Sequence, residues 1–289
     1  MRENFLDLSG KIDDATTQLL GTIADVAEYV RVPFFVVGAT ARDIILMHGY
    51  GLRTIRATRD IDLGVEVSEW QEYETLKEAL LSTGVFAASM EHQRVTYRDM
   101  LQIDLVPFGP IAQPGNAFSW PSDKETQMNT LGFEEAYRSS MTIRLKSDPV
   151  LEIKFASLAG LAAMKIISWN DNYPFRRKDA EDLSIIMQTY LDAGNRDRLY
   201  EEEDDLLETD DFDYVLAGSR LLGRDIGEIL SPETRAAVLE ILGRETGTQE
   251  RYRLVEDMLT ADRPVTASDG FDGRLQLVEA LKAGILDKE

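Results

Sequence analysis

Apolar positions in the first half of the chain recur with two different periods. Helical spacing from Asp14 to Val30 predicts an amphipathic helix, and the apolar run at 33–37 predicts a short buried strand that ends at Gly38. The segments 95–97 and 101–106 are expected to form a hairpin. The pattern further predicts helices at 39–48 and 70–81 and strands at 61–67, 142–145 and 150–153.

The pattern becomes helical after Lys154 and stays so to the end, with helices expected near 155–170, 176–192, 213–230, 233–245, 250–260 and 273–284. The segment 107–128 is rich in Pro, Gly, Ser and Asn and is expected to be an ordered loop. The chain is therefore assigned to the α+β class. We expect an N-terminal domain at 1–154, with a mixed sheet flanked by helices, and an all-helical domain at 155–289.

Length and composition are those of a folded globular protein without a membrane-spanning segment. The 289 residues allow two domains or one large domain, and 44% hydrophobic residues exclude wholesale disorder. No apolar run approaches the roughly 20 residues of a membrane span. The charged N-terminus does not resemble a signal peptide. We therefore expect a cytoplasmic protein without a membrane partner.

Residue usage narrows the available chemistry. The absence of Cys excludes disulfides, zinc–thiolate sites and iron–sulfur clusters, and the two histidines, His48 and His92, leave little for a histidine-based centre. Carboxylates, Lys, Arg, hydroxyls and oxygen-liganded metals remain. The net charge of −21 weighs against a protein that coats nucleic acid, since such binding depends on clustered Lys and Arg.

Three carboxylates stand on predicted strands. Asp60 and Asp62 open one strand and share a face, and Asp104 lies between apolar neighbours on another. Because an unpaired buried carboxylate is costly, these acids need a partner, and Mg²⁺ with oxygen ligands fits. Two such ions would suit in-line nucleotidyl transfer. The alternative is that Asp60 and Asp62 pair with Arg56 or Arg59 at a sheet edge.

The strand before these acids ends in a glycine turn that leads into a helix. Free backbone N–H groups at such a turn suit a phosphate, and the hydroxyl of Thr40 adds a donor. The alternative is that Gly38 only permits the turn.

A second group of charges lies in the helical half. Lys165 sits on or beside the apolar face of its helix, where a lysine either snorkels to solvent or holds an anion. In the next helix, Lys178 and Asp182 are four residues apart, and Asp179 shares the face of Asp182. This segment is either an exposed ion-pair network or a phosphate contact made by the three consecutive cations at 176–178.

Together these motifs resemble the AbiEii/AbiGii-type nucleotidyltransferases of the DNA polymerase β-type superfamily. The resemblance spans about residues 33–187. Its motifs are Gly38-Ala39-Thr40-Ala41, Thr58 two positions before Asp60-Ile61-Asp62, the third acid Asp104, the helix residue Lys165, and the segment 176–183.

The resemblance implies a nucleotidyltransferase fold and a role for each matched residue. Asp60, Asp62 and Asp104 would ligate two Mg²⁺ ions, and Asp104 would help to deprotonate the attacking hydroxyl. The backbone of Gly38 and Ala39, with Thr40, would hold the β- and γ-phosphates of an NTP, and the helical domain would complete the nucleotide cleft. The further nucleotide contacts that it implies are Arg59, Lys165, Arg177, Lys178, Asp179 and Asp182.

The implied reaction is attack of an acceptor hydroxyl on the α-phosphate of an NTP, with release of pyrophosphate. The acceptor would be an RNA such as tRNA, or a protein, and the enzyme would be a toxin of a toxin–antitoxin or phage-defence system with an antitoxin partner. Two alternatives remain open. An acidic surface suits a cationic small molecule such as an aminoglycoside, and a non-catalytic scaffold could keep the same fold.

The acidic run at 201–213 is most simply a solvated linker. The alternative is that it folds over the cationic cleft as a mimic of nucleic acid.

Overall fold

The computed structural model describes residues 5–53, 60–121, 123–208, 212–248, 251–259 and 270–288. The chain separates into two compact units, Met1–Ser157 and Leu158–Glu289.

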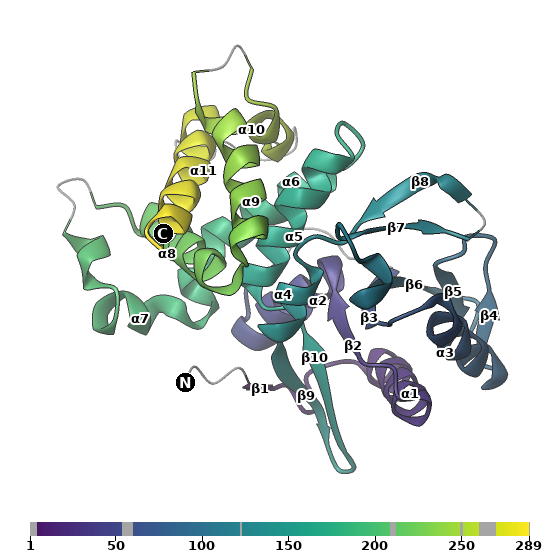
Figure 1. The fold of residues 1–289 in the computed structure, drawn as a ribbon. Coiled ribbons are helices and arrows are strands. Elements are labelled where there is room, and N and C mark those ends of the chain that lie inside the picture. Colours follow the sequence, from purple (N-terminus) through teal and green to yellow (C-terminus); the bar gives the residue numbers. More distant parts are fainter. Residues whose placement is uncertain are drawn as a thin grey trace. The chain divides into compact units, whose positions relative to one another are not determined.

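Among the described residues of the first unit, eight strands form one mixed sheet (Figure 1). Strand β3 runs parallel to β6 and antiparallel to β2, and β5 runs antiparallel to β6. The order across the sheet is β1 (Phe5–Asp7), β9 (Met141–Ser147), β10 (Val150–Phe155), β2 (Phe34–Val37), β3 (Asp60–Glu66), β6 (Leu101–Phe108), β5 (Arg94–Tyr97) and β4 (Phe86–Ala88). The mixed sheet and the hairpin expected from the sequence are confirmed.

The two faces of the central strands differ in chemistry. One face presents buried apolar side chains, with Ile61, Leu63 and Val65 on β3 and Ile103 and Leu105 on β6. Because side chains alternate along a strand, the residues between them point to the opposite face. That opposite face begins with acids on β3 and β6 and becomes aromatic further along the strands.

An aromatic cluster fills the far part of the acidic face. Phe35 on β2 lies opposite Gly64 on β3, and its ring packs 5.5 Å from Phe108 and 5.3 Å from Tyr137, measured between centroids. Tyr137 lies on α4 (Phe133–Arg138). A Cβ atom at Gly64 would overlap the Phe35 ring and lie 2.8 Å from its Cδ1. The missing side chain of Gly64 therefore makes the space for Phe35.

Helices accompany the sheet at several points of the first unit. They are α1 (Asp14–Val30), which packs against α3 (Trp70–Ser82), and α2 (Gly38–Asp43), which follows β2. The predicted helix at 39–48 is correct in place, but its second half, Ile44–Gly49, is a π-helical turn.

The expected loop at 107–128 is wrong in part. It contains a 3₁₀ turn at Pro110–Ala112 and a hairpin of β7 (Ala117–Trp120) and β8 (Asp123–Asn129). Phe118 and Trp120 pack on Trp70 of α3, with ring centroids 5.6 and 5.4 Å away. These aromatic contacts stabilise a hairpin whose strand pattern is interrupted in sequence by Pro121.

The described part of the second unit is helical, as expected. Its helices are α5 (Leu158–Asp171), α6 (Arg177–Thr189), α7 (Arg196–Glu201), α8 (Tyr214–Ile229), α9 (Pro232–Thr246), α10 (Arg253–Met258) and α11 (Phe271–Leu286). Helix α8 packs along α11, and the Ser219 hydroxyl donates to the Leu277 carbonyl at 2.8 Å. Within the described residues, each helix is too short or too polar to span a bilayer.

The start of the acidic run is docked on α8, so the expectation of a solvated linker is wrong there. Glu203 is only 9% exposed, and it accepts a hydrogen bond from Arg224. The same guanidinium donates to Asp205 and, through Nε at 2.7 Å, to Asp287. Glu203 and Asp205 are thus counter-ions of Arg224 within the helical unit. They are therefore not part of a segment that covers a cationic cleft. Residues 209–211 of the run lie outside the described residues.

These ion pairs shift the carboxylate pKa values. The hydrogen bond from Arg224 is the main reason that the pKa of Asp205 lies below its usual value of 3.8. Burial opposes the shift at Asp287, but hydrogen bonds from Arg220 and Arg224 still lower its pKa. A carboxylate with a lowered pKa stabilises the folded state above its unfolded pKa, and this contribution disappears as the pH falls through the folded pKa.

We expect Gly64→Ala to destabilise the first unit by about 1–3 kcal/mol, because the added methyl group must displace the Phe35 ring. Thermal or urea unfolding measures the change. Gly21→Ala is the matched control. Its Cβ would meet only Leu151, at an ordinary 3.5 Å, so we expect equal or higher stability. A Gly64→Ala protein as stable as the Gly21→Ala control would contradict the packing described here.

We expect the free energy of unfolding of the helical unit to fall as the pH drops below about 4, because the unfolded chain then binds protons that Asp205 and Asp287 resist. In urea titrations across this pH range, Asp287→Asn should reduce the acid-dependent loss. Asp204→Asn serves as the control, since among the described residues its carboxylate is not a partner of Arg224. Equal acid sensitivity of wild type and Asp287→Asn would argue against this ion-pair network.

Candidate active site

The glycine turn and the first acidic strand meet directly. Val37, the last residue of β2, lies opposite Asp62 on β3. Gly38 follows with φ +69°, a left-handed conformation that favours glycine. A Cβ atom there would overlap Asp62 Oδ2 and lie 2.9 Å from its Cγ. The Asp62 carboxylate therefore lies against the Gly38 backbone, in space that any other residue would fill.

The three predicted acids occupy one face of the sheet. Asp62 and Asp104 lie side by side in the parallel register of β3 and β6, and Asp60 shares their face because it lies two residues before Asp62. Asp60 is exposed, whereas Asp62 and Asp104 are half-buried. The sheet thus brings together the strand positions that the sequence singled out.

Asp104 is held by a residue that sequence reasoning missed. Arg94 on β5 lies opposite Asp104, with Nε 2.7 Å from Oδ1 and Nη2 2.8 Å from Oδ2. These hydrogen bonds, with the charges of Asp104, Glu91 and Asp60, raise the pKa of Arg94 above its usual range, and burial only partly opposes them. The hairpin register contained the signal. With Tyr97 opposite Leu101, moving three residues back along β5 and three forward along β6 places Arg94 opposite Asp104.

Residues of the glycine motif are engaged within the first unit. The Thr40 hydroxyl donates to the Asp60 carbonyl at 2.8 Å, which connects α2 to the start of β3. This bond engages the hydroxyl proton that was expected to be donated to a phosphate. Ala39 is buried. Arg42, only 1% exposed, is paired with Asp43 at 2.6 Å. Arg59, together with the alternative partner Arg56, lies outside the described residues.

In the helical unit, Lys165 is buried and bound by two acids. Its ammonium lies 3.1 Å from Asp179 Oδ1 and 2.6 Å from Asp182 Oδ2, and the three side chains are at most 12% exposed. Snorkelling is therefore wrong for Lys165, which holds anions of its own chain. The network also contains Arg176, whose Nε lies 3.3 Å from Asp179 Oδ2.

The neighbouring cations at the start of α6 lie at the surface, and Arg177 donates a hydrogen bond to the Leu259 carbonyl. Arg177 and Lys178 are exposed, and the guanidinium of Arg177 lies 3.5 Å from Glu181. The exposed ion-pair interpretation therefore holds for Arg177 and is wrong for the buried Asp179 and Asp182.

The described residues contain no group of three or more His, Asp or Glu side chains arranged to hold a metal ion. Both oxygens of Asp104 are hydrogen-bonded to Arg94.

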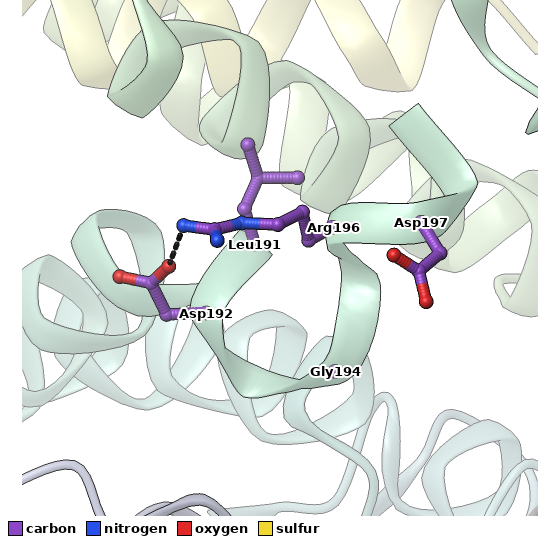
Figure 2. A pocket seen from close by; sticks show the side chains of 5 residues that line it. All are labelled: Leu191, Asp192, Gly194, Arg196 and Asp197. Carbon is purple, nitrogen blue, oxygen red and sulfur yellow. Dashed lines mark hydrogen bonds and ion pairs between the residues drawn. The ribbon is translucent and has the colours of Figure 1, made fainter. Parts of the chain in front are cut away.

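A separate hollow of about 250 Å³ lies in the helical unit, lined by Leu191, Asp192, Gly194, Arg196 and Asp197. Figure 2 shows the Arg196 side chain reaching across it to Asp192, 3.4 Å away. The phenol of Tyr214 bonds both of these side chains. The charged groups of the hollow are thus largely paired with each other, and it contains none of the predicted site residues.

A mixed sheet with neighbouring carboxylates beside a glycine turn, followed by helices, fits the class of nucleotidyltransferases. A family model described as "Nucleotidyl transferase AbiEii toxin, Type IV TA system" matches residues 26–272. The chain therefore belongs to the AbiEii nucleotidyltransferase toxin family, and it is a transferase. This confirms the resemblance inferred from the motifs and disfavours a non-catalytic scaffold.

Solved structures resemble the chain at low identity, and no functionally curated protein matches it significantly. ANT(2")-Ia in complex with adenylyl-2"-tobramycin is 15% identical, with a TM-score of 0.39, over 64% of this chain and 98% of that one. A nucleotidyltransferase-like protein from Paracoccidioides brasiliensis is 13% identical, with a TM-score of 0.39, over 65% and 88%. A CCA-adding enzyme with ATP is 16% identical, with a TM-score of 0.32, over 86% and 63%. The family assignment rests on the family model alone.

We expect Gly38→Ala to lower nucleotidyl transfer by about 100-fold or more, since the new methyl group must push the Asp62 carboxylate aside and small misplacements cost that much. Gly51→Ala is the matched control. Gly51 also has a left-handed φ, of +70°, but a Cβ there meets nothing within 4 Å. Comparing initial rates of the two variants separates backbone strain from the contact with Asp62, and equal rates would contradict this role of Gly38.

Proposed function

We propose that this protein is a Mg²⁺-dependent nucleotidyltransferase that moves a nucleoside monophosphate from an NTP to a hydroxyl group of RNA, such as tRNA, or of a protein. It would act in the cytoplasm as the toxin of a toxin–antitoxin pair. One observation carries the proposal. In a chain of the AbiEii family, Asp60, Asp62 and Asp104 share one face of adjacent strands, with Asp62 resting on the turn at Gly38.

The residues present fit a magnesium ion. Carboxylate oxygens are hard ligands, and Mg²⁺ usually takes one or two of them together with phosphates of the substrate. Asp60 is exposed at the start of β3, and Asp62 is fixed against the Gly38 backbone. These two acids would hold the ion. The ion would neutralise charge on the phosphates during in-line transfer.

The remaining predicted residues would position the substrates. Backbone N–H groups at Gly38 and Ala39 suit the β- and γ-phosphates. The Thr40 hydroxyl, bonded to the Asp60 carbonyl, fixes this turn relative to the acidic strand. Asp104 would help to remove the proton of the acceptor hydroxyl, as the family resemblance implies.

The helical unit would complete the nucleotide cleft, with exposed cations at the start of α6. Lys165 on α5 holds Asp179 and Asp182 on the first turns of α6, and this fixes the segment that carries Arg177 and Lys178. Lys165 itself would act on the triphosphate only if it exchanged one of these carboxylates for a phosphate. Arg59 would be a further nucleotide contact.

The second candidate is transfer to a small cationic acceptor, such as an aminoglycoside. The net charge of −21 favours it, because an acidic protein attracts cations and repels RNA. The family favours the macromolecular acceptor, since its description names a toxin of a Type IV system.

The test incubates the protein with each α-labelled NTP, Mg²⁺, and either total tRNA, cell protein or aminoglycosides. We expect label on a macromolecule, reduced more than about 100-fold in Asp60→Asn and Asp62→Asn, since even loss of an outer-shell partner of a metal costs 10–100-fold. Asp99→Asn is the matched control, because this exposed turn residue has φ 57°, which asparagine adopts readily. We expect it to keep full activity.

Label transfer that persists in both Asp60→Asn and Asp62→Asn would refute the metal assignment. Label on aminoglycosides alone would establish the second candidate, and no transfer to any acceptor would refute both.

A further inference from the structure

The ion pair of Arg94 and Asp104 lies inside the proposed metal site. Asp62, Asp104 and Arg94 form one row across the adjacent strands β3, β6 and β5. The guanidinium therefore occupies the third place in a row whose first two places are carboxylates. Its position follows from the register of the β5–β6 hairpin.

This pair differs from another arginine pair across strands of the same sheet. Arg144 on β9 lies opposite Glu152 on β10, and its Nε and Nη2 both bond the one oxygen Oε1. Those side chains are 33% and 37% exposed. Arg94 instead bonds both oxygens of Asp104, and the two side chains are only 21% and 15% exposed. Such a bidentate, half-buried pair is the stronger kind, and it uses both carboxylate oxygens.

Arg94 also interacts with acids other than Asp104. Its Nη1 lies 3.7 Å from Glu91, and it feels the charge of Asp60 as well as that of Asp104. Without Arg94, Asp104 would lose its bidentate cation and would stand beside Asp62 in the register of the sheet, two positions along from Asp60. Neighbouring carboxylates repel one another, so a divalent cation taken up at Asp104 would relieve this repulsion.

We propose that Arg94 and a second divalent cation compete for Asp104. The protein without nucleotide then binds one cation, at Asp60 and Asp62, and Asp104 becomes a ligand only when Arg94 leaves it. Arg94 is thus a positioning residue that acts through Asp104. This inference rests on the proposed function, because it takes Asp60 and Asp62 as the site of the first ion.

Binding of Mn²⁺ without nucleotide tests the competition, with free Mn²⁺ measured by electron paramagnetic resonance in moderate salt. We expect one equivalent on the wild type, lost in the Asp60→Asn/Asp62→Asn double variant. Arg94→Met should bind a second equivalent, and Arg94→Met/Asp104→Asn should return to one. Arg144→Met is the matched control, since it removes the same charge from a cross-strand pair in the same sheet and should bind as the wild type does.

Several results would overturn the proposal. They are two equivalents on the wild type, an Arg94→Met protein that binds like Arg144→Met, or a second equivalent that survives Asp104→Asn. If Arg94→Met does not fold by circular dichroism, Arg94→Lys takes its place, because an ammonium keeps the charge but lacks the planar fork. Arg94→Lys should bind a second equivalent that the wild type lacks, and its absence at saturating Mn²⁺ counts against the proposal.

The outcome is separable from that of the proposed function. Mn²⁺ binding that depends on Arg94 and Asp104, in a protein that labels no acceptor, would refute the reaction and leave the competition standing. Label transfer that needs Asp60 and Asp62, in a protein whose Mn²⁺ binding does not change in Arg94→Met, would support the reaction and refute the competition.

Discussion

The contact between the Asp62 carboxylate and the Gly38 backbone is the constraint on which the first unit's chemistry depends. It joins the end of β2 to the middle of β3 and fixes one acid where a side chain at position 38 would otherwise lie. The hydrogen bond from Thr40 to the Asp60 carbonyl fixes the same junction from the helix side. Because both contacts involve backbone atoms, the geometry of the acids is determined by the fold as much as by the side chains.

Local periodicity was sufficient for much of this arrangement. Alternation along β3 predicted that Asp60 and Asp62 share a face, and an acid between apolar neighbours marked Asp104. Strand register decides what each acid meets, however. The pairing of Asp104 with Arg94 was missed because the predicted strand of the hairpin began at residue 95, one position after Arg94. The hairpin of β7 and β8 was missed because it depends on contacts of Phe118 and Trp120 with Trp70, 48 and 50 residues earlier in the sequence.

The buried charges of the helical unit show the same limit. Helical spacing placed Lys165 near an apolar face and grouped Asp179 with Asp182, but it gave no sign that the three side chains bury one another. A lysine between two carboxylates is stable in the interior because each charge has a partner. Removing one partner would leave an uncompensated buried charge, so the network constrains the residue types at these three positions.

Several cationic side chains of this protein form ion pairs with acids of the same chain. Arg42, Arg94, Lys165, Arg198 and Arg224 are each at most 21% exposed in their side chains and bind carboxylates. The protein as a whole carries a net charge of −21, so it repels an approaching polyanion. Proteins that grip RNA through exposed lysines lose affinity as ionic strength rises. Here the protein and the polyanion are both negatively charged. Added salt would screen their repulsion and so speed their association.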